Sequence, residues 1–144
     1  MRCGYLSQEI GDYFPWGALT AYGLIMDALT SLTARGADLL ESARTATSRR
    51  AAAPVFSSPV LKAVLLGLAE GGALAEHAAP PAATLHCLQG TARLYAGDKE
   101  WVLNAGDLAA VPAERHGVDA VTDCILLLTV AAGVAPAPVE GTIG

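Results

Sequence analysis

Short apolar runs follow one another along the chain from about residue 60 to residue 131. Valine, leucine and alanine dominate these runs, which are VLKAVLLGLAE, GALAEHA, TLHCLQ, ARLYAG, KEWVLN, DLAAVP, HGVDAV and CILLLTVA. Pairs of turn-forming residues such as GG, PP, QG, GD and AG separate them at intervals of roughly eight to ten residues. This rhythm predicts an all-β sandwich or barrel.

The last of these runs is apolar at successive positions rather than at alternate ones. Ile125, Leu127 and Thr129 share one face of the expected strand, and the residues between them are equally apolar. Strands that are apolar on both faces are usually covered on both sides. We therefore expect the barrel to carry a further layer, supplied by a helix, by a second subunit or by both.

One helix is predicted over about residues 28–46, before the apolar runs begin. Its apolar residues fall near one helical stripe, namely Leu29, Leu32, Leu39, Leu40 and Ala43. Asp27 has a side chain suited to the N-cap of this helix. The stripe has to be buried against another surface, so we expect the helix to cover part of the barrel.

The sequence changes in character at several points, and these divide the chain into five parts. They are residues 1–25, an extension outside the fold; 26–50, the helical part; 51–59, a linker of small and turn-forming residues; 60–131, the barrel; and 132–144, a disordered tail. The first 25 residues are rich in aromatic side chains but show no sustained period. Because the change at Met26 is abrupt, we hypothesise that the natural start is Met26.

Charge and length narrow the possible functions. The 144 residues suit one domain and carry a net charge of −5. Basic residues never cluster beyond Arg49 and Arg50, so we expect no nucleic-acid partner. The longest charge-free runs are shorter than the roughly 18–20 apolar residues that a bilayer span needs. We therefore expect no membrane partner and a cytoplasmic location.

Glycine, histidine and proline spacings in the barrel region resemble those of the cupin superfamily. The first motif of that family is G-x5-H-x-H-x3-E-x6-G, and the corresponding positions here are Gly71, His77, Ala79, Ala83 and Gly90. The second motif begins G-x5-P and ends in a histidine, and Gly106, Pro112 and His116 match it with one residue fewer before the histidine. The resemblance covers about half the chain. It implies an all-β fold, a cupin (jelly-roll-type) β-barrel preceded by an N-terminal α-helix.

The resemblance also implies a metal site, which this sequence retains only in part. In the family, three histidines and a glutamate converge on Fe, Mn, Zn or Ni inside the barrel. Here Ala79 replaces the second histidine and Ala83 replaces the glutamate. The remaining candidate metal ligands are His77 and His116. We expect either no cofactor or a weakly bound divalent transition metal (Zn, Fe, Mn or Ni).

The candidate ligand pocket comprises the inward positions of the two motifs and of the strand that follows the first. These residues are His77, Ala79, Ala83, Leu85, Cys87 and His116. Strand alternation counted from position 83 turns Leu85 and Cys87 inward and His86 outward. A zinc site of Cys87, His77 and His116 is chemically reasonable. Cys87, however, lies roughly 13 Å along a strand from position 83. The bland interpretation of Cys3, Cys87 and Cys124 is that all three are buried, reduced thiols.

Three functions remain open. The loss of two ligands favours a small-molecule-binding cupin-domain protein with a sensor, carrier or accessory role. The alternatives are a metal-dependent enzyme (an oxygenase, isomerase or lyase) that uses His77 and His116, and a structural dimerisation module in which the CILLLTV strand forms the interface. Whether the protein is an enzyme stays open, and no catalytic residue is identified. We expect a small-molecule ligand and a homodimer.

Overall fold

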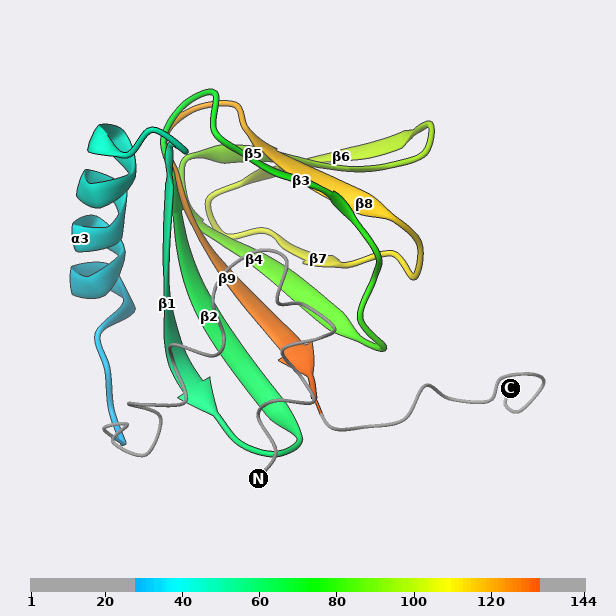
Figure 1. The fold of residues 1–144 in the computed structure, drawn as a ribbon, viewed down its shortest axis with the longest axis horizontal. Helices are drawn as coiled ribbons and strands as arrows, with labels where there is room; N and C mark the ends of the chain where they lie inside the picture. Colours follow the sequence, from blue (N-terminus) through cyan, green and yellow to red (C-terminus); the bar gives the residue numbers. More distant parts are fainter. Residues whose placement is uncertain (1–27, 133–144) are drawn as a thin grey trace.

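The structure of the protein is a computed structural model, which describes residues 28–132. One helix precedes nine strands within these residues (Figure 1). The elements are α3 (Leu32–Thr45), β1 (Arg50–Ser57), β2 (Leu61–Leu68), β3 (Ala73–His77), β4 (Ala83–Gln89), β5 (Thr91–Ala96), β6 (Lys99–Asn104), β7 (Leu108–Ala110), β8 (His116–Ala120) and β9 (Cys124–Ala131). The expectations for residues 1–25 and for the tail after Ala132 lie outside the described residues.

The strands form two antiparallel sheets that face each other. One sheet has the order β1-β2-β9-β4-β7, and the other has the order β3-β8-β5-β6. The chain crosses between the sheets repeatedly, so neighbours within a sheet are seldom consecutive in sequence (Figure 1). This is the jelly-roll arrangement with a preceding helix, and the predicted fold class is confirmed.

The main core lies between the two sheets. Alternate residues of β2 and β9 point into it, including Val64, Leu66, Leu126 and Leu128, each at most 6% exposed. The other sheet contributes Leu94 from β5, which is fully buried. Burial of both inner faces is the main stabilising term for such a sandwich.

Helix α3 covers the outer face of the five-stranded sheet (Figure 1). Leu40 packs there with Leu65 and Ile125 in a second apolar cluster. The helix begins later than the sequence predicted, because Ser31 rather than Asp27 is its N-cap and accepts the Ala34 N–H. Leu29, which the sequence assigned to the buried stripe, precedes the helix and is 85% exposed.

Two glycines let the helix approach the sheet closely. An ideal Cβ on Gly67 of β2 would lie 2.8 Å from backbone atoms of Leu39 and Leu40. A Cβ on Gly36 of the helix would lie 2.8 Å from a methyl carbon of Ile125. The absence of a side chain at both positions therefore sets the distance between α3 and the sheet.

An ion pair holds the end of the helix to the turn between β8 and β9. The Arg44 Nε donates to Asp123 Oδ2 at 2.8 Å, and the Glu70 backbone N–H donates to Asp123 Oδ1 at 2.8 Å. The backbone hydrogen bond from Glu70, followed by that from Arg44, lowers the pKa of Asp123. Asp123 thus connects α3, the end of β2 and the start of β9.

The segment 51–59, which the sequence predicted to be a linker, is mostly strand β1. The alanines at its start lie along β2, and the strand extends from Arg50 to Ser57. Pro54 does not prevent this, because β1 is the outermost strand of its sheet and a proline without an N–H is tolerated there. The pairing shifts register between Pro54 and Phe56, which accommodates the proline locally.

The last strand, for which the sequence suggested a role in a dimer interface, is covered on both faces within this chain. β9 lies between β2 and β4, with the core on one face and α3 on the other. Ile125 and Leu126, which point to opposite faces, are both buried within this chain. The helix supplies the second layer that the apolar pattern required.

The two cysteines in the described part of the chain are free and buried. Cys124 is enclosed at the start of β9, and burial raises its pKa to about 12. Burial also raises the pKa of the Cys87 thiol. Both therefore remain protonated thiols at neutral pH. Among residues 28–132 there is no helix of the length and hydropathy that crossing a bilayer requires.

The close contact at Gly67 predicts a stability effect that can be measured by chemical denaturation. Gly67→Ala forces a methyl group against helix backbone and should lower the free energy of unfolding by about 1–3 kcal/mol. Gly36→Ala is the matched comparison, since its methyl meets a side chain that can rotate and alanine favours the helix by about 1 kcal/mol. Gly36→Ala should therefore lower the free energy of unfolding by less than Gly67→Ala does. Equal stability of Gly67→Ala and the wild type would contradict the close approach of helix and sheet.

Candidate functional site

The pairing of β3 with β8 places His77 directly opposite His116. Leu74 and Val118, which also face each other across these strands, point into the core. His116 lies two residues before Val118 and so shares its inward face. His77 lies three residues after Leu74, but a register shift between Leu74 and His77 returns it to the same face.

The two imidazole rings contact each other inside the fold. Their centroids are 4.3 Å apart and the ring planes meet at 69°, an edge-to-face arrangement. His77 is 7% exposed and His116 is 3% exposed. The shorter second motif therefore does not turn His116 away from the interior.

Both histidines are oriented by hydrogen bonds to the backbone two residues earlier. The His77 Nδ1 lies 2.7 Å from the Ala75 carbonyl oxygen, and the His116 Nδ1 lies 2.9 Å from the Glu114 carbonyl oxygen. A carbonyl oxygen only accepts, so each Nδ1 carries the proton and donates it. The neutral form of each ring then has its lone pair on Nε2.

Several solved structures that are similar to this fold are described as cupins. Similar structures include a cupin superfamily protein from Desulfitobacterium hafniense, with 20% identity, a TM-score of 0.54 and coverage of 58% of this chain and 77% of that one. An RmlC-like cupin from Shewanella frigidimarina has 24% identity and a TM-score of 0.51, with coverage of 62% and 78%. The chain has the fold of a small cupin domain.

A further similar structure belongs to a protein of unknown function. It is a conserved protein of unknown function from Streptococcus pyogenes, with 20% identity, a TM-score of 0.60 and coverage of 77% of this chain and 93% of that one. At the level of sequence, the chain matches no protein-family model, and no curated protein is significantly similar to it. The comparisons therefore show the cupin fold alone, and a proposal about the activity has to rest on the geometry of the site.

The other predicted pocket residues lie on β4 and just before it. Ala83 and Leu85 face the core from β4, as the strand alternation predicted, and Leu85 is 1% exposed. Ala79 lies after the end of β3, in the connection to β4, and is half-buried. Because β3 ends at His77, strand alternation does not decide which way position 79 faces.

Cys87 is inward but belongs to the far end of β4. Its thiol donates to the Gln89 and Gly90 carbonyl oxygens at the turn that follows the strand. The structure thus gives the Cys87 thiol backbone partners away from the histidines, and the alternative zinc site of Cys87, His77 and His116 is wrong. His86 points away from the core, opposite Leu127 and Leu108.

The residues at the cupin metal position do not fit a resident metal. Across residues 28–132, no three or more His, Cys, Asp or Glu side chains gather where they could hold an ion. His77 and His116 supply two imidazoles, whereas structural and catalytic zinc sites use three or four protein ligands. Methyl groups occupy the positions of the missing histidine and glutamate, Ala79 and Ala83.

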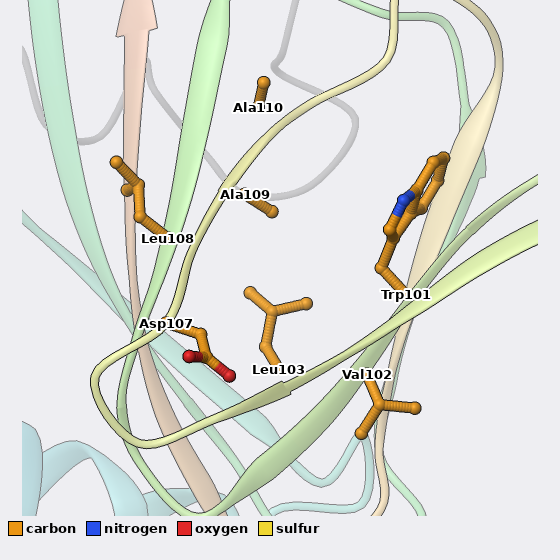
Figure 2. Close-up of a pocket in the computed structure, with 7 residues that line it drawn as sticks. All are labelled: Trp101, Val102, Leu103, Asp107, Leu108, Ala109 and Ala110. Carbon is orange, nitrogen blue, oxygen red and sulfur yellow. The ribbon is translucent and has the colours of Figure 1, made fainter.

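A second candidate region, which the sequence did not reveal, lies between β6 and β7. A pocket of about 550 Å³ opens there (Figure 2). Its walls are formed by Trp101, Val102, Leu103, Asp107, Leu108, Ala109 and Ala110. The alternation of Trp101 with Leu103 was visible in the sequence, but nothing in the sequence placed β6 beside β7.

Restoring the missing ligands tests whether the cupin metal positions still converge. Ala79→His with Ala83→Glu should raise the affinity for Zn²⁺ by orders of magnitude, because an imidazole and a carboxylate join the two existing imidazoles. The matched control is Ala78→His with Ala82→Glu, which adds the same groups at exposed neighbouring positions. Calorimetric titration measures both, and equal affinities would show that positions 79 and 83 do not face His77 and His116.

Proposed function

We propose that the protein is a small-molecule-binding cupin-domain protein, with a sensor, carrier or accessory role, whose pocket works without a resident metal. One observation carries this proposal. Two buried histidines are paired across β3 and β8, and both are fixed in one tautomer, while the remaining metal-ligand positions are alanines. The pair has kept its orientation but has lost the partners that metal chemistry requires.

The histidine pair favours a ligand that donates hydrogen bonds. With each Nδ1 proton engaged by a carbonyl, the neutral rings offer Nε2 as an acceptor. The nearby inward positions of β4, Ala83 and Leu85, offer only apolar contacts. A ligand with a hydroxyl group on an apolar body matches both features. Each hydrogen bond of this kind contributes about 1 kcal/mol, or roughly fivefold in affinity.

The metal-dependent enzyme is the alternative, and it makes a different demand on the site. Two imidazoles leave most of the coordination sphere of a divalent ion to water, so such an ion is easily removed. A metal-dependent reaction would need tightly bound metal in the purified protein. The metal content therefore separates the two functions.

A homodimer remains the expected assembly, and since both faces of β9 are covered within one chain, we look for its interface elsewhere. Phe56, Val60 and Leu61 are exposed near the turn between β1 and β2, with 46%, 61% and 41% of their surfaces accessible. Exposed apolar residues that lie together are typical of interaction surfaces. We propose that this turn contributes to the interface between two copies.

Binding of phenol, in the presence of EDTA, tests the proposed function. Phenol has an apolar body and one hydroxyl donor, and anisole is the matched compound without the donor. Phenol should bind the wild type more tightly than anisole. Whichever of His77→Ala and His116→Ala removes the Nε2 that accepts the hydroxyl should weaken phenol binding by about fivefold. Anisole binding should stay unchanged, and His86→Ala should match the wild type.

Elemental analysis of the untagged, chelator-free protein completes this test. The expected content is far less than one equivalent of Fe, Mn, Ni or Zn. One equivalent that disappears in His77→Ala would overturn the proposal in favour of a metal-dependent enzyme. Equal binding of phenol and anisole would also contradict it, since the histidines would then recognise no donor.

A further inference from the structure

The pocket between β6 and β7 lies where the two sheets meet along their open edges. β6 is the last strand of one sheet and β7 is the last strand of the other. Neither histidine of the proposed site is among the residues that line this pocket. Its volume of about 550 Å³ falls within the usual range for small-molecule sites, which is about 300–1,000 Å³.

The pocket exists because a large residue on one edge faces small residues on the other. Trp101 lies opposite Leu94 on β5, and Leu94 points into the core, so Trp101 continues the inner face of its sheet. On β7, Ala109 lies opposite Leu85 and also belongs to the inner face. A methyl group does not reach the indole across the gap between the sheets, and the space stays open (Figure 2).

The pocket leaves apolar surface exposed to water, which is unfavourable. Trp101 lines it and is 41% exposed, while Leu103 forms a buried part of the wall. An exposed indole beside a hollow is typical of a binding site. The indole of Trp101 is the largest apolar surface among these residues.

Asp107 gives the pocket its charge. Among the described residues that line the pocket, Asp107 alone is charged. Its Oδ2 accepts the Asn104 backbone N–H at 2.8 Å, and its own backbone N–H donates to the Asn104 carbonyl oxygen at 2.9 Å. This turn fixes the position of the Asp107 carboxylate, so binding does not have to order it.

We infer that this pocket binds a small organic cation, an ammonium group attached to an aromatic or branched apolar body. The carboxylate of Asp107 attracts the positive charge, and the face of Trp101 adds a cation–π or stacking contact. Leu103 and Ala109 receive the apolar body. An anion of the same size would be repelled by the carboxylate and would find no basic lining residue among those described.

Three probes of similar size and different charge test this inference. They are benzylammonium, benzyl alcohol and benzoate, titrated by calorimetry into the full chain. The cation should bind at least fivefold more tightly than the neutral alcohol, and benzoate should bind most weakly. The chain contains two tryptophans, Trp16 and Trp101, whose indole N–H signals can be assigned with Trp16→Phe. The Trp101 signal should shift with saturation as the cation is added.

Substitutions locate the site and separate it from a structural effect. Asp107→Asn keeps an oxygen that accepts the Asn104 N–H but removes the charge. It should therefore lower the affinity for the cation by about fivefold and leave the affinity for benzyl alcohol unchanged. Asp98→Asn, at the exposed turn between β5 and β6, is the matched control and should have no effect. Ala109→Leu should abolish binding of both probes by filling the pocket.

Trp101 and the histidines supply the remaining controls. Trp101→Leu should lower the affinity for the cation more than Trp101→Phe does, because phenylalanine keeps an aromatic face. His77→Ala and His116→Ala should leave cation binding intact, so the failure of either site is distinguishable from that of the other. Benzoate binding as tightly as the cation, or Asp107→Asn binding the cation like the wild type, would overturn the inference.

Discussion

Both faces of β9 must be covered, and the rest of the structure depends on this constraint. Leu126, Leu128 and Val130 point into the space between the sheets, and Ile125 points to the helix. One face therefore requires the second sheet, and the other requires α3. The glycine on β2 lets the helix come close enough to complete the second cluster. A chain of this size thereby buries a strand that is apolar throughout without a second subunit.

The same sandwich holds the histidines in place after most of the metal site is gone. β3 and β8 belong to the sheet that closes the core, so the orientation of His77 and His116 follows from strand pairing and from backbone carbonyls. No metal is needed to align them. With alanine at positions 79 and 83, the ligand set of the cupin metal site is incomplete, and two oriented imidazoles remain. The proposed recognition by hydrogen bonds depends on this orientation and not on a bound metal.

The sequence predicted the fold and part of the site because both depend on the spacing of a few glycine and histidine residues. Gly71, His77 and Gly90 keep the cupin intervals, and Gly90 has a φ of +81° at a turn where a Cβ would lie 2.0 Å from a carbonyl oxygen. β1 was missed because alanine, serine and proline indicate a loop, whereas an edge strand tolerates them. The pocket at Trp101 and Asp107 could not be predicted, since it arises where the edges of two different sheets meet. Local pattern specifies each strand, but long-range packing decides which edges become neighbours.

His77 and His116 each donate the Nδ1 proton to a backbone carbonyl oxygen, which leaves Nε2 of each neutral ring as the acceptor. Long-range ¹H–¹⁵N NMR spectra of the imidazole rings, recorded on metal-free protein above the pH at which histidine is charged, report which nitrogen carries the proton. The chain contains three histidines, and His86, which points away from the core, serves as the internal reference. We expect the Nδ1–H tautomer for both His77 and His116. Protonation of both rings at Nε2 instead would contradict it.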